Sequence, residues 1–135
     1  MICYLYPEPT YFFFAPDLPE LLYYSHIPSI IIATLVGLFV FIKAPKKLEN
    51  QLLLLISLSF SGWVILSLLV WAGNDATMFA FIWPFFAVFS AFMAIFSIYF
   101  AYVFAYKKDA PGIIKLILLA LLAPVLLLAH TDLSI

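Results

Sequence analysis

The chain has 135 residues, of which 67% are hydrophobic and 10% are charged, and its six lysines and seven acidic residues give a formal net charge of −1. A soluble domain is about 45–50% apolar and about 25% charged, so this composition excludes an ordinary soluble protein and predicts an all-α integral membrane protein. The chain has no arginine and its lysines lie in two short patches, which argues against nucleic-acid binding. The single cysteine, Cys3, excludes a disulfide within these residues.

Residues 1–22 form a tail that is rich in prolines and aromatic rings. Proline lacks a backbone donor and disfavours helix at the residue before it, so we expect no spanning helix in this segment. Tyrosine and phenylalanine rings collect where a membrane meets water. We therefore predict an interfacial tail, which the charge pattern described below places outside the cytoplasm.

Two apolar segments follow the tail, and both provide the roughly 20 residues that cross a bilayer. The first span is predicted over about 23–42, with Pro28 in its first turn, where proline is tolerated. The second is predicted over about 51–72, between Asn50 and the turn-forming residues 73–75. Both segments are therefore predicted to be transmembrane helices.

The third hydrophobic segment is longer than one crossing requires. Residues 76–106 carry no charge, and as a single helix they would extend about 46 Å, beyond the ~30 Å hydrocarbon core. Pro84 divides the segment, so we predict the third span over about 84–106 and an interfacial lead-in over 77–83. One steeply tilted, kinked helix through Pro84 is the alternative.

The fourth span is predicted over about 113–129. It is short for a crossing unless the Lys115 side chain reaches back to the interface, and Pro124 in its second half is expected to kink it. Residues 131–135 would then form an extracytoplasmic end. The four spans, over residues 23–130, are expected to pack as a four-transmembrane-helix bundle.

The positions of the lysines predict how the chain is oriented in the membrane. They lie in the connections after the first and third spans, whereas the tail, the connection after the second span and the last residues contain none. Cytoplasmic loops carry the excess of positive charge, so we predict a multi-pass protein of the cell (plasma or inner) membrane with both chain ends outside. The topology-determining residues are Lys43, Lys46, Lys47, Lys107, Lys108 and Lys115.

Small residues recur at intervals of three or four in the first three spans, a spacing that lets helices approach closely in lipid. We predict that they form the packing seams of the bundle. The predicted positions are Ser29, Ala33, Gly37, Ser57, Ser61, Ser90, Ala94, Ser97 and Ala101. The alternative is a polar cavity lined by Ser57, Ser61, Ser67, Ser90 and Ser97.

None of the four spans has a charged residue or a histidine in its middle. Because an intramembrane charge usually marks a proton relay or a transport path, its absence argues against a pump, a voltage sensor and a path for charged substrates. His26 and His130 lie at the outer ends of spans, and without a third ligand they predict interface residues rather than a metal site. Trp63 and Trp71 suggest an aromatic belt or, alternatively, the walls of a ligand pocket. We expect no catalytic residue, no cofactor and no metal here, and therefore no enzyme.

The second span resembles a known family in the stretch KLENQLLLLISLSFSGWVILSLLVWAG. It is similar to the second helix of the N-terminal seven-transmembrane sensor region of bacterial histidine kinases. The matching features are Asn50 at the inner start of the helix, a serine- and leucine-rich run, and Trp63 about a dozen residues on.

The next two spans extend the resemblance. The stretch FAYVFAYKKD is similar to the family's third helix, which runs into a basic cytoplasmic loop. The stretch KLILLALLAPVLLLAHTD is similar to the family's fourth helix, with Pro124 inside the helix and Thr131 where the chain leaves it. The resemblance covers about residues 25–135, which would be the first four helices of seven.

The resemblance implies a membrane sensor or signal-input module, and the reading frame is then expected to continue past Ile135 into three more spans and an output domain. Any kinase activity would lie in that missing part. The partners implied are the lipid bilayer, a cytoplasmic signalling domain on this or a separate chain, and a second copy in a homodimer.

Two other functions stay open from the residues alone. A complete four-helix protein that acts as an assembly subunit or a small permease would have a stop codon after Ile135. A membrane-embedded enzyme would have to build its site from the polar groups at one side of the membrane, which are His26, Asp75, His130 and Asp132.

Overall fold

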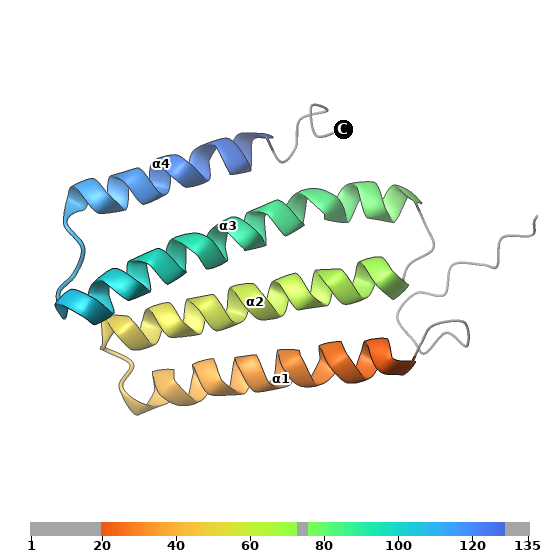
Figure 1. Ribbon diagram of the computed structural model, residues 1–135, viewed down its shortest axis with the longest axis horizontal. Helices are drawn as coiled ribbons and strands as arrows, with labels where there is room; N and C mark the ends of the chain where they lie inside the picture. The colour runs from red at the N-terminus through yellow and green to blue at the C-terminus, as the bar shows by residue number, and fades with distance from the viewer. Residues whose placement is uncertain (1–19, 73–75, 129–135) are drawn as a thin grey trace, which may run out of the picture.

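The structure, a computed structural model, describes residues 20–72 and 76–128. These residues form four α-helices, which are α1 (Glu20–Lys43), α2 (Leu48–Ala72), α3 (Ala76–Tyr106) and α4 (Gly112–Leu128) (Figure 1). The first three helices are long and apolar enough to cross a membrane, and α4 is a shorter apolar helix. The predictions about residues 1–19, about the connection 73–75 and about residues 129–135, which include His130 and Thr131, lie outside the described residues.

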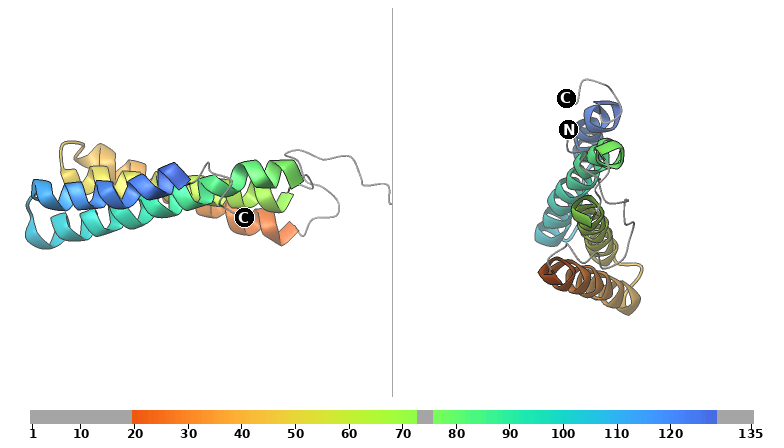
Figure 2. Two further views of the ribbon diagram at one scale, coloured as in Figure 1. Left: turned by 90° about the horizontal axis from the view of Figure 1, so that it is seen from above. Right: turned by 90° about the vertical axis from the view of Figure 1, so that its right-hand side faces the viewer.

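The four helices lie side by side in chain order as a single layer (Figures 1 and 2). The central helix α2 packs against α1 on one side and α3 on the other, whereas α4 contacts only α3, and less extensively. A closed bundle would require α1 to meet α4, and the described residues of these two helices make no contact. The predicted bundle is therefore an open layer, because short connections join neighbouring helices while no hydrophobic force closes a layer of helices in lipid.

Serines make up an unusual share of the buried residues. The buried apolar residues are Leu52, Val64, Ile82, Val103, Ala110 and Leu118, and the buried polar residues are Ser57, Ser59, Ser61 and Ser67. All four buried serines belong to α2, because this helix is covered from both sides. The interior of the layer is therefore polar along its central helix.

The two prolines of α1 and α3 lie within helices rather than at their beginnings. The helix α1 begins at Glu20, so Pro28 lies beyond the predicted first turn. The helix α3 runs unbroken from Ala76, so Pro84 lies inside it, as in the alternative of one long helix. A proline within a helix removes one backbone hydrogen bond, and the long apolar segments around Pro28 and Pro84 remain helical despite that loss.

The other helix ends follow local chemistry. At the end of α1, the Ala44 N–H donates to the Phe41 carbonyl at 3.2 Å, which tightens the last turn, and Pro45 cannot continue the helix. At the end of α3, Lys107 has a φ of 52° and its N–H donates to the Val103 carbonyl at 2.8 Å. This left-handed residue is the usual way to end a helix, although glycine is the residue that most often occupies the position.

Candidate functional site

A polar seam joins α1 to α2. Gly37 lies directly against Ser57, because a Cβ atom on Gly37 would be only 2.7 Å from the Ser57 Cβ and Oγ atoms. The Thr34 and Ser61 hydroxyls are 2.9 Å apart, so one donates to the other. Nearer the opposite end, His26 Nε2 lies 3.3 Å from Ser67 Oγ. We call these three contacts the α1–α2 seam, and Gly37, Ser57 and Ser61 are among the predicted packing positions.

Both ring nitrogens of His26 have hydrogen-bonding partners. Nδ1 lies 2.9 Å from the Leu22 carbonyl oxygen and 2.9 Å from the Ser25 hydroxyl oxygen, both on α1. Nε2 lies 3.3 Å from the Ser67 hydroxyl oxygen on α2. The contact with Ser67 makes His26 a hydrogen-bonding residue between two helices. Within the described residues no group of three or more metal-ligating side chains occurs.

Asn50 closes the turn between α1 and α2. Its side-chain Nδ2 donates to the Val40 carbonyl at 2.9 Å and to the Ala44 carbonyl at 3.2 Å. Carbonyls in the last turn of a helix lack N–H partners of their own, so Asn50 supplies a donor to the Val40 carbonyl at the end of α1. The Ala44 carbonyl accepts from Asn50 and also from the Lys47 N–H, at 3.1 Å. The neighbouring Gln51 donates to the Pro45 carbonyl at 2.8 Å. The family-like position Asn50 therefore has a structural role that can be stated from geometry.

Aromatic rings of α3 pack against α2. A Cβ atom on Gly62 would lie 2.4 Å from the Phe89 ring. Trp63 meets Phe86 edge-on, with ring centroids 5.7 Å apart and an interplanar angle of 85°. Within α3 itself, Trp83 contacts Phe86 at 6.0 Å between centroids. The family-like Trp63 therefore lies in the α2–α3 contact.

The predicted seam residues of α3 are exposed in the layer, namely Ser90, Ala94, Ser97 and Ala101. Small residues permit close approach but do not select a partner, and the larger rings of α3 fill the contact with α2 instead. The predicted serine cavity is likewise divided, since Ser57, Ser61 and Ser67 are buried on α2 whereas Ser90 and Ser97 are exposed on α3.

The remaining residues singled out from the sequence lie on α1, α2 and α4. Ser29 and Ala33 are half-buried on α1, and the Ser29 hydroxyl donates to the Ser25 carbonyl of the same helix at 2.7 Å. Trp71 is 65% exposed near the end of α2. Pro124 lies inside α4.

All six lysines lie at one end of the layer, where α1 and α3 end and α2 and α4 begin (Figure 1). We call this end, with Lys43, Lys46, Lys47, Lys107, Lys108 and Lys115, the lysine end. The Lys107 ammonium is 3.1 Å from the Glu49 carboxylate, which links the end of α3 to the start of α2. Lys107 also lies over the Phe104 ring, at 4.1 Å from its centroid.

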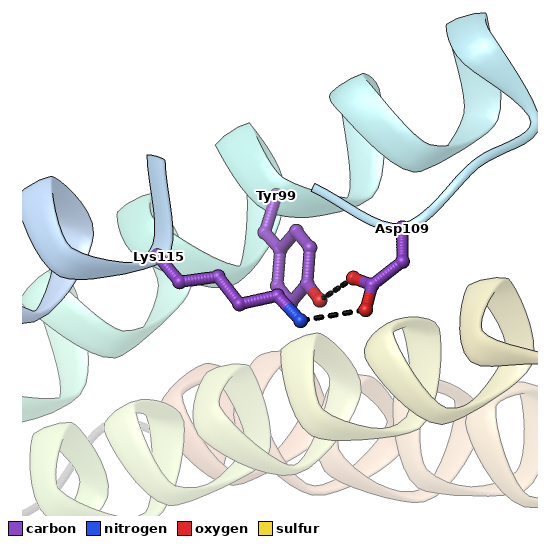
Figure 3. A network of polar contacts seen from close by, with 3 residues as sticks. All are labelled: Tyr99, Asp109 and Lys115. Carbon is purple, nitrogen blue, oxygen red and sulfur yellow. Dashed lines mark hydrogen bonds and ion pairs between the residues drawn. The ribbon is translucent and has the colours of Figure 1, made fainter. Parts of the chain in front are cut away.

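A three-residue network joins α3, the next connection and α4 at the lysine end (Figure 3). The Tyr99 hydroxyl donates to one oxygen of Asp109, and the Lys115 ammonium is 2.6 Å from the other. The hydrogen bonds from Lys115 and then from Tyr99 hold the pKa of Asp109 below its ordinary value. Lys115 thus reaches back toward the start of its helix, the direction expected for a lysine at the end of a short span.

This pKa shift gives a direct prediction. Replacing Lys115 with glutamine should raise the pKa of Asp109 toward its ordinary value, because the ammonium that stabilises the carboxylate is removed. A carbon-13 NMR titration of the aspartate carboxyl carbons in detergent micelles measures it, with Tyr99→Phe as the variant that should shift the pKa less. Equal Asp109 pKa values in the wild type and Lys115→Gln would contradict the network.

The same shift sets the pH range over which the contact stabilises the protein. Because the folded-state pKa of Asp109 is lowered, its contribution is fully present above the unfolded-state value of about pH 4 and is lost as the pH falls through the folded-state value. All three groups are accessible to solvent, so the contact between α3 and α4 that they provide is a weak one.

Comparison with protein-family models, with curated proteins and with solved structures gives no match to this chain. The roles of Asn50 and Trp63 therefore follow from their contacts alone, as the donor at the end of α1 and the ring against Phe86.

Proposed function

We propose that this chain is a multi-pass membrane protein whose lysine end faces the cytoplasm and which acts as a signal-input module. The observation that supports the membrane location is the gathering of all six lysines at one end of a layer whose first three helices are long and apolar enough to span. Cytoplasmic ends of membrane helices carry the excess of lysine. The resemblance of the segment around Asn50 and Trp63 to the sensor region of histidine kinases supports the signalling role.

The unequal strength of the helix contacts suggests how such a module would transmit a signal. The helices α1 and α2 are held by the α1–α2 seam and by Asn50, so they would move as a pair. The helix α4 touches only α3, and its polar tie is the exposed network of Tyr99, Asp109 and Lys115. A stimulus that shifts α4 against α3 would therefore meet little resistance and could be passed to a cytoplasmic domain.

The orientation is tested by cysteine labelling in intact cells. With Cys3 replaced by serine, single cysteines at positions 46 and 108 should react with a membrane-impermeant maleimide only after lysis. A cysteine at position 74, in the connection predicted to lie outside, is the matched control and should react in intact cells. Labelling of positions 46 and 108 before lysis would overturn the proposed orientation.

The signalling role is tested by the nucleotide sequence that follows codon 135. Three further hydrophobic spans and a cytoplasmic signalling domain in the same reading frame are expected. A stop codon with no such domain encoded nearby would remove the main support for a signal-input module.

A second candidate function is an assembly subunit, and one observation favours it. The small residues Ser90, Ala94, Ser97 and Ala101 lie exposed on α3, where another helix could approach closely. Co-purification of the chain with a larger membrane complex, lost when Ala94 is replaced by leucine, would support this function over signal input. The permease variant has less support, since the buried polar side chains of the described residues are all serines.

A further inference from the structure

The lysine end has more positive charge than its own acidic groups can pair. Two carboxylates, Glu49 and Asp109, lie at this end with the six lysines, and they pair with Lys107 and Lys115. Four positive charges are therefore left over. An excess of one sign of charge raises the local concentration of ions of the opposite sign.

Three of the lysines are free to meet an external anion. Lys46, Lys47 and Lys108 are exposed and have no acidic partner within the described residues. Lys43 differs, since its ammonium lies 5.3 Å from the centroid of the Phe39 ring. The free ammonium groups thus belong to the two connections, one between α1 and α2 and the other between α3 and α4.

The ion pair of Lys107 with Glu49 makes one surface out of these two connections. It holds the residue before Lys108 against the start of α2, and the start of α2 follows Lys46 and Lys47 directly in the chain. The network of Tyr99, Asp109 and Lys115 fixes the other side of the second connection (Figure 3). Residues far apart in the sequence thereby contribute to the same positive surface.

We propose that the lysine end is a binding surface for the headgroups of anionic lipids, with Lys46, Lys47 and Lys108 as the residues that carry it. This inference rests on the membrane location in the proposed function. The three ammonium groups lie just beyond the ends of apolar helices, which is the depth at which lipid phosphates lie beside a spanning helix. Each lysine near an anionic lipid surface contributes about a five-fold factor in binding.

The test uses the purified full chain in detergent micelles, where membrane orientation has no meaning. Native mass spectrometry compares the retention of dioleoylphosphatidylglycerol with that of the zwitterionic dioleoylphosphatidylcholine. The wild type should prefer the anionic lipid, and the preference should fall as salt rises. The triple variant Lys46→Gln/Lys47→Gln/Lys108→Gln should lose roughly a hundred-fold in anionic-lipid affinity, since three five-fold factors are removed.

The matched control is Lys46→Arg/Lys47→Arg/Lys108→Arg, which keeps the charge and should keep the preference. Circular dichroism confirms that both variants have the helix content of the wild type. Equal retention of the two lipids by the wild type, or an unchanged preference in the glutamine variant, would overturn the proposal.

Two competitors separate the lipid from other anions. Displacement of the bound lipid by millimolar inorganic phosphate, or by a polyglutamate peptide, would assign the surface to a free anion or an acidic protein and overturn the proposal. The cysteine labelling described above reports on membrane orientation independently. If lipid binding fails while the lysine end still labels as cytoplasmic, the inference is overturned and the proposed membrane location stands.

Discussion

Replacing Gly37 with leucine is expected to separate α1 from α2 and to lower the free energy of unfolding by about 3 kcal/mol. The reason is the closeness of the two helices at this point. Even a single Cβ atom on residue 37 would lie 2.7 Å from the Ser57 Cβ and 3.4 Å from the Leu54 Cα. Neither atom can rotate away, so the helices themselves must move apart.

Gly62 provides an instructive contrast. A Cβ atom there would meet the Phe89 ring at 2.4 Å, a shorter distance than at Gly37. The obstructing atoms belong to the outer part of a side chain, however, and a ring can turn where a Cβ cannot. Gly62→Ala is therefore expected to destabilise the protein less than Gly37→Ala, despite the shorter distance.

The measurement is unfolding by sodium dodecyl sulfate in dodecylmaltoside micelles, followed by circular dichroism. Val36→Leu is the matched control, because Val36 is the neighbouring residue on α1 and is 50% exposed. A compensating change sharpens the test, since Gly37→Ala combined with Ser57→Gly moves the Cβ atom at this contact from α2 to α1. The double variant should be more stable than the sum of its single variants implies, by about 1 kcal/mol. Additive effects would show that residues 37 and 57 are not in contact.

The sequence was sufficient to predict the helices and the common position of the lysines. Both depend on local properties, namely the length of each apolar run and the charge of each connection. Gly37 and Ser57 could also be selected as packing positions, because a spacing of four places small residues on one face of a helix.

The partners of each helical face could not be predicted in the same way. The small residues of α3, such as Ala94 and Ser97, lie exposed, while Phe89 and Trp63 take part in the α2–α3 contact. A spacing shows which face allows close approach but not whether another helix uses it. Whether the layer closes into a bundle depends on contacts between distant helices, for which the spacing of residues within one span contains no information.

The prolines show that a rule about a single residue does not predict where a helix begins. Pro28 was predicted in the first turn of a span over about 23–42, and the third span was predicted to begin at about Pro84, yet both prolines lie inside helices. The loss of one hydrogen bond is local, whereas the preference of a long apolar segment for helix extends over every residue on both sides. A rule about one residue therefore placed both prolines too close to a helix start.

Replacing Asn50 with aspartate is expected to lower the free energy of unfolding by about 3 kcal/mol at pH 7. The change keeps the size of the side chain but exchanges its donor for an acceptor. The new carboxylate oxygen would face the Val40 and Ala44 carbonyl oxygens, to which the amide now donates at 2.9 and 3.2 Å. Two side-chain hydrogen bonds are lost and the carboxylate faces two carbonyl oxygens, of which the Ala44 oxygen still accepts from the Lys47 N–H. Each polar group left unsatisfied contributes about 1–3 kcal/mol of destabilisation.

The pH dependence of Asn50→Asp distinguishes this cause from a simple loss of packing. The carboxylate facing two carbonyl oxygens has no proton to donate, and protonation at low pH supplies one. The penalty is therefore fully present well above the folded-state pKa and diminishes as the pH falls through it, because the protonated acid donates one hydrogen bond. Asn50→Leu lacks this group and should show no such recovery.

The same unfolding assay, repeated from pH 7 to pH 4, measures both effects. Gln51→Glu is the matched control. Gln51 is the next residue and is exposed, and its side chain donates a hydrogen bond to the Pro45 carbonyl. It should cost less than 1 kcal/mol, because water can satisfy an exposed carbonyl. Equal losses for Asn50→Asp and Gln51→Glu would show that Asn50 does not hold the end of α1.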